Sequence, residues 1–141
     1  MAGRLVSIIA KTQFNQQGTT QITVGPRSIL TTDWRSGLLS VRIQNLTSWD
    51  PTAVLVIAVT NAFISEEDPS TLLVDPYENL AEIILNSAIL VPGAAPFQGV
   101  FTAALNQPIG PMVAIKTYLN FGAASTACIW EMSIDLLGRD I

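Results

Sequence analysis

The sequence predicts an all-β protein, an antiparallel two-sheet sandwich of about eight strands with jelly-roll or immunoglobulin-like connectivity. The first observation behind this prediction is that short runs rich in Val, Ile, Thr, Phe and Tyr are separated by turn residues at nearly even spacing. The second is the regular alternation of apolar and polar residues in the last run, CIWEMSIDLL. A closed barrel is the alternative architecture, because it also buries one face of each strand.

The chain length fits a single domain over residues 1–141, which is enough chain to build a hydrophobic core. Residues 1–12 are a candidate extended arm at the start of this domain. No internal repeat, low-complexity tract or linker divides the sequence.

Nine segments are expected to form strands: 5–12, 19–24, 28–32, 38–46, 53–62, 82–91, 99–105, 112–120 and 127–137. In the fourth of these, Leu39, Val41 and Ile43 share one face and should point into the core. In the last, the alternation over ten residues places one apolar set on the inward face: Cys128, Trp130, Met132, Ile134 and Leu136.

Residues 76–81 are the one stretch that looks locally helical. Pro76 suits the first position of a helix, and Asp75 suits the capping position before it. We predict one short helical turn there.

The fifth predicted strand begins AVLVIAV and is apolar on both faces, although a strand that covers a core on one face only should alternate. In one interpretation the protein is a homo-oligomer, and Leu55, Ile57 and Val59 form the subunit interface. In the other, the second face is covered within the same chain by the turn at 76–81 and the loop at 106–111. The two interpretations differ in whether a monomer can exist.

Charged residues are scarce in this chain. They make up 13% of the residues, compared with about 25% in an ordinary soluble domain, and only Lys11 and Lys116 are lysines. A free monomer usually keeps more surface charge for solubility, so we interpret the composition as that of a protein whose surface is largely covered by other subunits. A compact β domain coated with Thr, Asn and Gln is the alternative.

The sequence argues against nucleic-acid and membrane partners. Phosphate binding needs clustered Lys and Arg, whereas the net charge is −4. A spanning helix needs about 20 apolar residues, and the longest unbroken apolar run covers only 53–59. The N-terminal stretch has too short an apolar region for a signal peptide.

The sequence contains no histidine and only one cysteine, Cys128. These counts exclude Ser-His-Asp and Cys-His triads, zinc sites with His ligands and intrachain disulfides. Cys128 shares a face with Trp130 and Met132, so we expect a buried, inert thiol rather than a nucleophile. We predict no catalytic residue, no metal and no cofactor, with glycoside hydrolysis by paired carboxylates as a distant alternative.

The segment SEEDPSTLLVDPYENLAE, residues 65–82, contains six of the eleven acidic residues and no basic one. The plainest interpretation is a solvated loop. Its carboxylates could also bind Ca²⁺, although their spacing is not that of an EF-hand. In a third interpretation, Glu66, Glu67, Asp68 and Asp75 dock onto a basic surface of a partner and set its register.

Trp34, Trp49 and Tyr77 lie in or beside predicted turns, where β-sandwich binding modules place aromatic side chains that stack on ligands. A carbohydrate- or surface-binding module that uses Trp34 and Trp49 is therefore the alternative function. Both tryptophans could instead pack over the ends of the sandwich.

Three stretches together resemble the small structural proteins of virus particles, and most closely the decoration or cement proteins of tailed bacteriophage heads. They are the extended MAGRLVSIIAKTQF, the two-faced AVLVIAVTNA and the alternating CIWEMSIDLL, in a chain without histidine and with few lysines. The resemblance concerns the general character of the whole chain, without a matching motif, so it assigns no functional residue.

The resemblance implies a non-enzymatic assembly protein that stabilises a particle surface. It further implies a homo-oligomer, with a trimer favoured, bound to a major capsid protein or another lattice. The location implied is the virion surface, after assembly in the host cytoplasm.

Overall fold

The computed structural model describes residues 3–17, 20–21, 28–64, 66–68, 72–74, 79–93, 97–106, 108–121 and 126–139, and in this part the regular elements are all strands. Their bounds are β1 Gly3–Gln16, β2 Thr20–Gln21, β3 Ser28–Leu30, β4 Ser36–Ser48, β5 Val54–Ile64, β6 Leu72–Val74, β7 Ala81–Leu85, β8 Phe97–Ala104, β9 Met112–Asn120 and β10 Cys128–Arg139. The predicted all-β class is confirmed.

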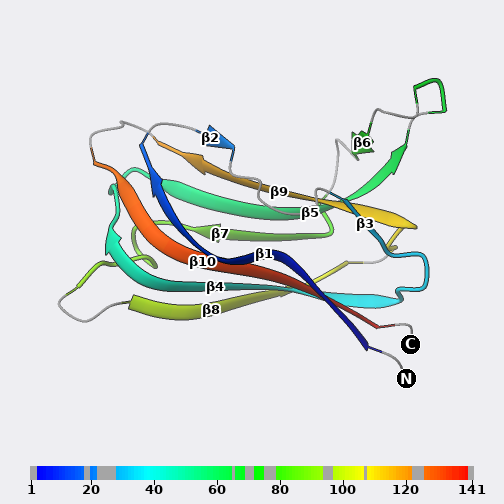
Figure 1. Cartoon of the computed structure of the whole chain (residues 1–141), viewed down its shortest axis with the longest axis horizontal. Helices are drawn as coiled ribbons and strands as arrows, with labels where there is room; N and C mark the ends of the chain where they lie inside the picture. Colours follow the sequence, from blue (N-terminus) through cyan, green and yellow to red (C-terminus); the bar gives the residue numbers. More distant parts are fainter. Residues whose placement is uncertain are drawn as a thin grey trace.

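The strands form two antiparallel sheets that face each other (Figure 1). One sheet has four strands in the order β1-β10-β4-β8. In the other, β9 and β5 pair in the centre, β2 and β3 pair successive parts of β9, and β7 and β6 pair successive parts of β5. The structure is thus the predicted two-sheet sandwich rather than the alternative closed barrel.

The strand order decides between the two connectivities that the sequence left open. β2 and β3 occupy one edge of the second sheet, and β6 and β7 occupy its other edge, so each of these pairs counts as one strand position. Numbered along the chain, the eight positions then run 1-8-3-6 in the first sheet and 2-7-4-5 in the second. Apart from β5, which pairs with the following β6 and β7, the strands lie beside partners that are distant in sequence, and the chain crosses between the sheets repeatedly. This is the order of a jelly roll, in which two Greek keys wrap around one core.

The core lies between the sheets and follows the predicted alternation. Leu39, Val41 and Ile43 on β4 are fully buried. The same is true of the predicted inward set on β10: Cys128, Trp130, Met132, Ile134 and Leu136. Period-two patterning therefore places these two neighbouring strands correctly.

The structure refines three of the predicted segments. Residues 3–12 of the candidate arm belong to β1, which pairs with β10 along its length. β7 ends at Leu85, because the Asn86 side chain accepts a hydrogen bond from the Ala88 N–H and closes a turn. β6 was not predicted, since its three residues lie within the acidic segment.

Half of the predicted helical turn, residues 76–78, lies outside the described residues. In its described part there is no helix, because Leu80 lies in a bend and β7 begins at Ala81. The Leu80 N–H donates to the Val59 carbonyl, which draws this segment onto the sheet instead.

Candidate interaction surfaces

The inward face of β5 carries the three residues predicted as a subunit interface. Leu55, Ile57 and Val59 are fully buried in the core of a single chain. The interface prediction for these residues is therefore corrected: they face the opposite sheet, so a neighbouring subunit cannot reach them.

The outward face of β5 is also covered within the chain. Val56, Ala58 and Thr60 are each less than a tenth exposed. Val56 lies opposite Ile84 on β7 and Tyr118 on β9, and Ala58 lies opposite Glu82 and Lys116. Short side chains in the central strand are thus flanked on both sides by longer ones.

The 106–111 loop contacts the end of β5, where Asn61 donates to the Pro108 carbonyl and accepts from the Gly110 N–H.

The two tryptophans proposed as ligand aromatics are both 7% exposed. Trp34 lies against Gly138, where an added Cβ would collide with its ring. Trp49 packs edge-on against Trp130 with ring centroids 5.4 Å apart, and its Nε1 donates to the Ala53 carbonyl at 3.3 Å. The ligand-stacking prediction is corrected, since both rings pack over the ends of the sandwich.

A buried carboxylate that the sequence analysis missed closes one of these ends. Asp50 is fully buried, and it accepts hydrogen bonds from the Thr52 N–H, the Thr52 hydroxyl and the Thr126 N–H at 2.6–2.9 Å. Its own N–H donates to the Cys128 Sγ at 3.3 Å. Burial raises the pKa of the Cys128 thiol, and this effect outweighs the opposing effect of that hydrogen bond. The cysteine is thus a buried, protonated thiol, as predicted.

The acidic residues of the 65–82 segment that can be placed lie at the tip of a hairpin. Glu66, Glu67 and Asp68 are exposed between β5 and β6, and Asp75 lies outside the described residues. Within the described part of the chain, no three or more His, Cys, Asp or Glu side chains are grouped to hold a metal ion. Docking of these acids onto a partner stays a prediction.

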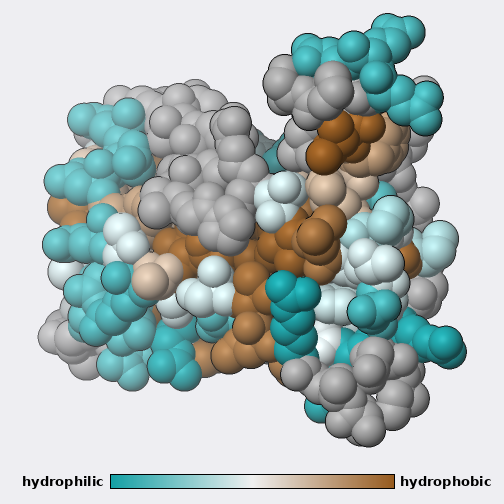
Figure 2. Space-filling model, turned by 45° about the vertical axis from the view of Figure 1, so that its right-hand side comes forward, coloured by the Kyte–Doolittle hydropathy of each residue, from teal (hydrophilic) through white to brown (hydrophobic). Residues whose placement is uncertain are grey.

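This β5–β6 hairpin, residues 62–74, also carries exposed apolar side chains. Phe63 pairs with Leu73 across the hairpin, and both are exposed, as is Ile64. Figure 1 shows the hairpin bending away from the sandwich, and Figure 2 shows apolar surface at its base beneath a hydrophilic tip. The sequence signal for it is the continuation of the apolar run through AFI, followed by the LLV of β6.

A second exposed apolar surface crosses the outer face of the four-stranded sheet. The strand registers align Leu5, Leu137, Leu38 and Ala104 in one row, which we call the apolar row. Leu5 is 68% exposed, Leu137 and Leu38 are half-buried, and Ala104 is exposed. The outer face of an antiparallel sheet is normally polar, so a transverse apolar row is a candidate contact surface.

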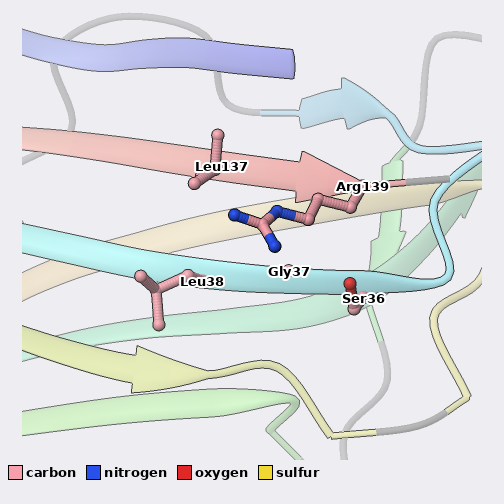
Figure 3. Close-up of a pocket in the computed structure, with 5 residues that line it drawn as sticks. All are labelled: Ser36, Gly37, Leu38, Leu137 and Arg139. Carbon is pink, nitrogen blue, oxygen red and sulfur yellow. The ribbon is translucent and has the colours of Figure 1, made fainter. Parts of the chain in front are cut away.

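A hollow of about 270 Å³ lies on this row. Its lining residues are Ser36, Gly37, Leu38, Leu137 and Arg139. Figure 3 shows the Arg139 guanidinium lying over β4 beside Gly37, between the side chains of Leu137 and Leu38. The hollow therefore combines apolar walls with one positive charge.

The described residues contain no helix that is long and apolar enough to cross a membrane. No protein-family model and no curated protein matches the sequence of this chain. In three dimensions the chain is similar to a chain in the solved structure of infectious bursal disease virus, Gx strain, with a TM-score of 0.54 and 12% sequence identity.

This similarity covers 96% of the present chain and 31% of the virus chain, so the present chain spans about a third of the length of its structural relative. At such low identity the match establishes a shared fold. The sandwich described above is therefore a β fold of the kind found in a virus particle.

Proposed function

We propose that this protein is a non-enzymatic structural component of a virus particle, and that it works by associating with copies of itself and with a capsid lattice. The observation that carries the proposal is the match of nearly the whole chain to a virus chain through a jelly-roll sandwich. The low content of charged residues supports it, because a surface covered in an assembly needs little charge for solubility.

The finer part of the proposal is a decoration or cement role at the virion surface, with a major capsid protein as the partner. The exposed apolar hairpin and the apolar row support a role in assembly, since soluble monomers rarely leave such patches without a purpose. Both patches lie outside the core, so the monomer can fold first and assemble afterwards.

The experiment that tests the proposal is the solution mass of the purified protein, measured by size exclusion with light scattering from micromolar to millimolar concentration. Electron microscopy of the same samples would reveal rings or lattices. We expect an oligomer that survives dilution. A species of 15.1 kDa at every concentration would contradict self-assembly.

A further inference from the structure

The apolar row and the β5–β6 hairpin are complementary in character. Two residues along β10 from Leu137, the exposed Arg139 lines the hollow on the row, and the half-buried Asp135 lies on the other side of the row. The hairpin exposes three apolar side chains, of which Phe63 and Leu73 share one face and Ile64 is next to Phe63 in the chain. At its tip it exposes Glu66 and Glu67. On the Arg139 side of the row, an apolar surface with a positive charge beside it therefore matches an apolar element with negative charge beside it.

The hollow on the row is large enough to receive an aromatic side chain from the hairpin. A protein cavity of about 150 Å³ admits a benzene ring, and this hollow measures about 270 Å³. Phe63 is 54% exposed, and its ring is the largest apolar group on the described part of the hairpin. The Arg139 guanidinium, which lies beside Gly37 in this hollow (Figure 3), could also stack on an aromatic ring.

The two surfaces of one chain cannot meet each other. The row lies on the outer face of the four-stranded sheet, whereas the hairpin extends from β5 in the opposite sheet. Figure 1 shows the hairpin turning away from the four-stranded sheet, with β9 and β5 between them. A contact between hairpin and row therefore needs two chains.

We propose that the β5–β6 hairpin of one copy docks onto the apolar row of a second copy, with Phe63 in the hollow and Glu66 and Glu67 near Arg139. This contact rests on the proposed function, and it specifies the surfaces through which the protein assembles. It joins two different surfaces, so each copy both gives a hairpin and receives one. Contacts of this kind close into a ring, extend into a filament or are made reciprocally in a two-fold dimer.

Four single substitutions test the contact by light scattering. Phe63→Glu and Leu5→Glu alter the hairpin and the row at exposed positions. Val100→Glu is the matched control, because Val100 is 58% exposed on the same sheet face but lies outside the row. Ile84→Glu is the control on the other sheet, where Ile84 is half exposed. Circular dichroism and thermal unfolding would verify that all four variants fold.

We expect Phe63→Glu and Leu5→Glu each to weaken association by about tenfold or more, because a buried anchor residue is replaced by a charge. Val100→Glu and Ile84→Glu should keep the wild-type mass. An oligomeric wild type whose mass is unchanged in both test variants would overturn the hairpin contact and leave the proposed function standing. A monomeric wild type would overturn the proposed function itself.

Mixing the two test variants tests whether the hairpin of one chain contacts the row of another. The Leu5→Glu chain keeps an intact hairpin and the Phe63→Glu chain keeps an intact row, so a mixture contains one complete contact per pair. We expect the mixture to form 1:1 dimers that neither variant forms alone. A mixture that stays monomeric would overturn the assignment.

A charge exchange tests the polar part of the contact. Arg139→Glu should weaken association by about tenfold or less and should reduce its sensitivity to salt. Adding Glu67→Arg to the same chain should restore much of the lost association. A double variant that is weaker than Arg139→Glu alone would place Glu67 away from Arg139 and overturn the docking orientation.

Discussion

β5 has two halves of similar hydropathy and opposite surroundings. In the first half, Leu55, Ile57 and Val59 are fully buried, and the alternate residues are covered as well. In the second half, Phe63 and Ile64 are exposed. The apolar residues before Thr60 and Asn61 are thus buried, whereas Phe63 and Ile64 after them are exposed.

The difference follows from what lies beside each half. The first half pairs with β9 on one side and β7 on the other, and it faces the four-stranded sheet. Pairing with β9 ends at Asn61, whose side chain holds the 108–110 loop, and beyond it β5 pairs with β6. Beyond this point Ala62 is still buried, whereas the described side chains of Phe63, Ile64 and Leu73 are exposed.

The largest expected effect comes from matched truncations in the two halves. Ile57→Ala should lower the free energy of unfolding by about 2–5 kcal/mol, because it opens a cavity in the core. Ile64→Ala should change it by about 0.5 kcal/mol or less, as is usual for exposed positions. Urea denaturation at low protein concentration measures both. Equal losses would contradict the assignment of the two halves.

The next largest effect is expected at Asp50, the buried carboxylate at one end of the sandwich. Asp50→Ala should lower the free energy of unfolding by about 3 kcal/mol, since it leaves the Thr52 and Thr126 N–H groups without their acceptor. Asp50→Asn keeps one acceptor oxygen and should lose less. Thermal unfolding of the pair gives the comparison, and identical midpoints for Asp50→Ala and wild type would count against a structural carboxylate.

A smaller loss is expected where Trp34 lies against Gly138. Gly138→Ala should lower the free energy of unfolding by about 2 kcal/mol, because the new Cβ must displace the indole ring. In a double-mutant cycle with Trp34→Leu, the two losses should be less than additive. Additive losses would indicate that the ring and the glycine are independent.

The smallest expected effect concerns the pH dependence of stability at Cys128. Its pKa is raised in the folded chain by burial, so the unfolded chain releases the thiol proton at lower pH than the folded one. The resulting stability is complete below the unfolded pKa of about 8.5 and is lost as the pH rises toward the folded pKa. Urea midpoints between pH 7 and pH 10 should fall less steeply for Cys128→Ala. Parallel curves for the two proteins would contradict the prediction.

The sequence was sufficient for the elements in which polar residues alternate with apolar ones. β10 and β4 were assigned to the correct faces, since Glu131 and Arg42 lie between apolar neighbours and mark the outward side. β9 was predicted with its observed bounds. The turn at Asn86 and the short β6 were missed, because a local hydrogen bond and a tertiary pairing overrode the composition.

The candidate surfaces were less predictable than the fold. Residue type and position in a turn suggested Trp34 and Trp49 as ligand aromatics, but the direction of a side chain in a turn depends on the elements packed around it. Nothing local in the sequence indicates that Leu5, Leu137, Leu38 and Ala104 form one row. They come from four strands, and only the registers between those strands align them.

The sequence by itself determined that this protein is an all-β sandwich with a buried thiol, because alternation and turn residues act over a few neighbouring positions. The tertiary structure decided the jelly-roll order, the burial of both faces of β5 and the exposure of the hairpin. These depend on which strands pair and where the second sheet ends, and such contacts join residues far apart in the chain. Hydropathy specifies that an apolar face will be covered, whereas topology specifies what covers it.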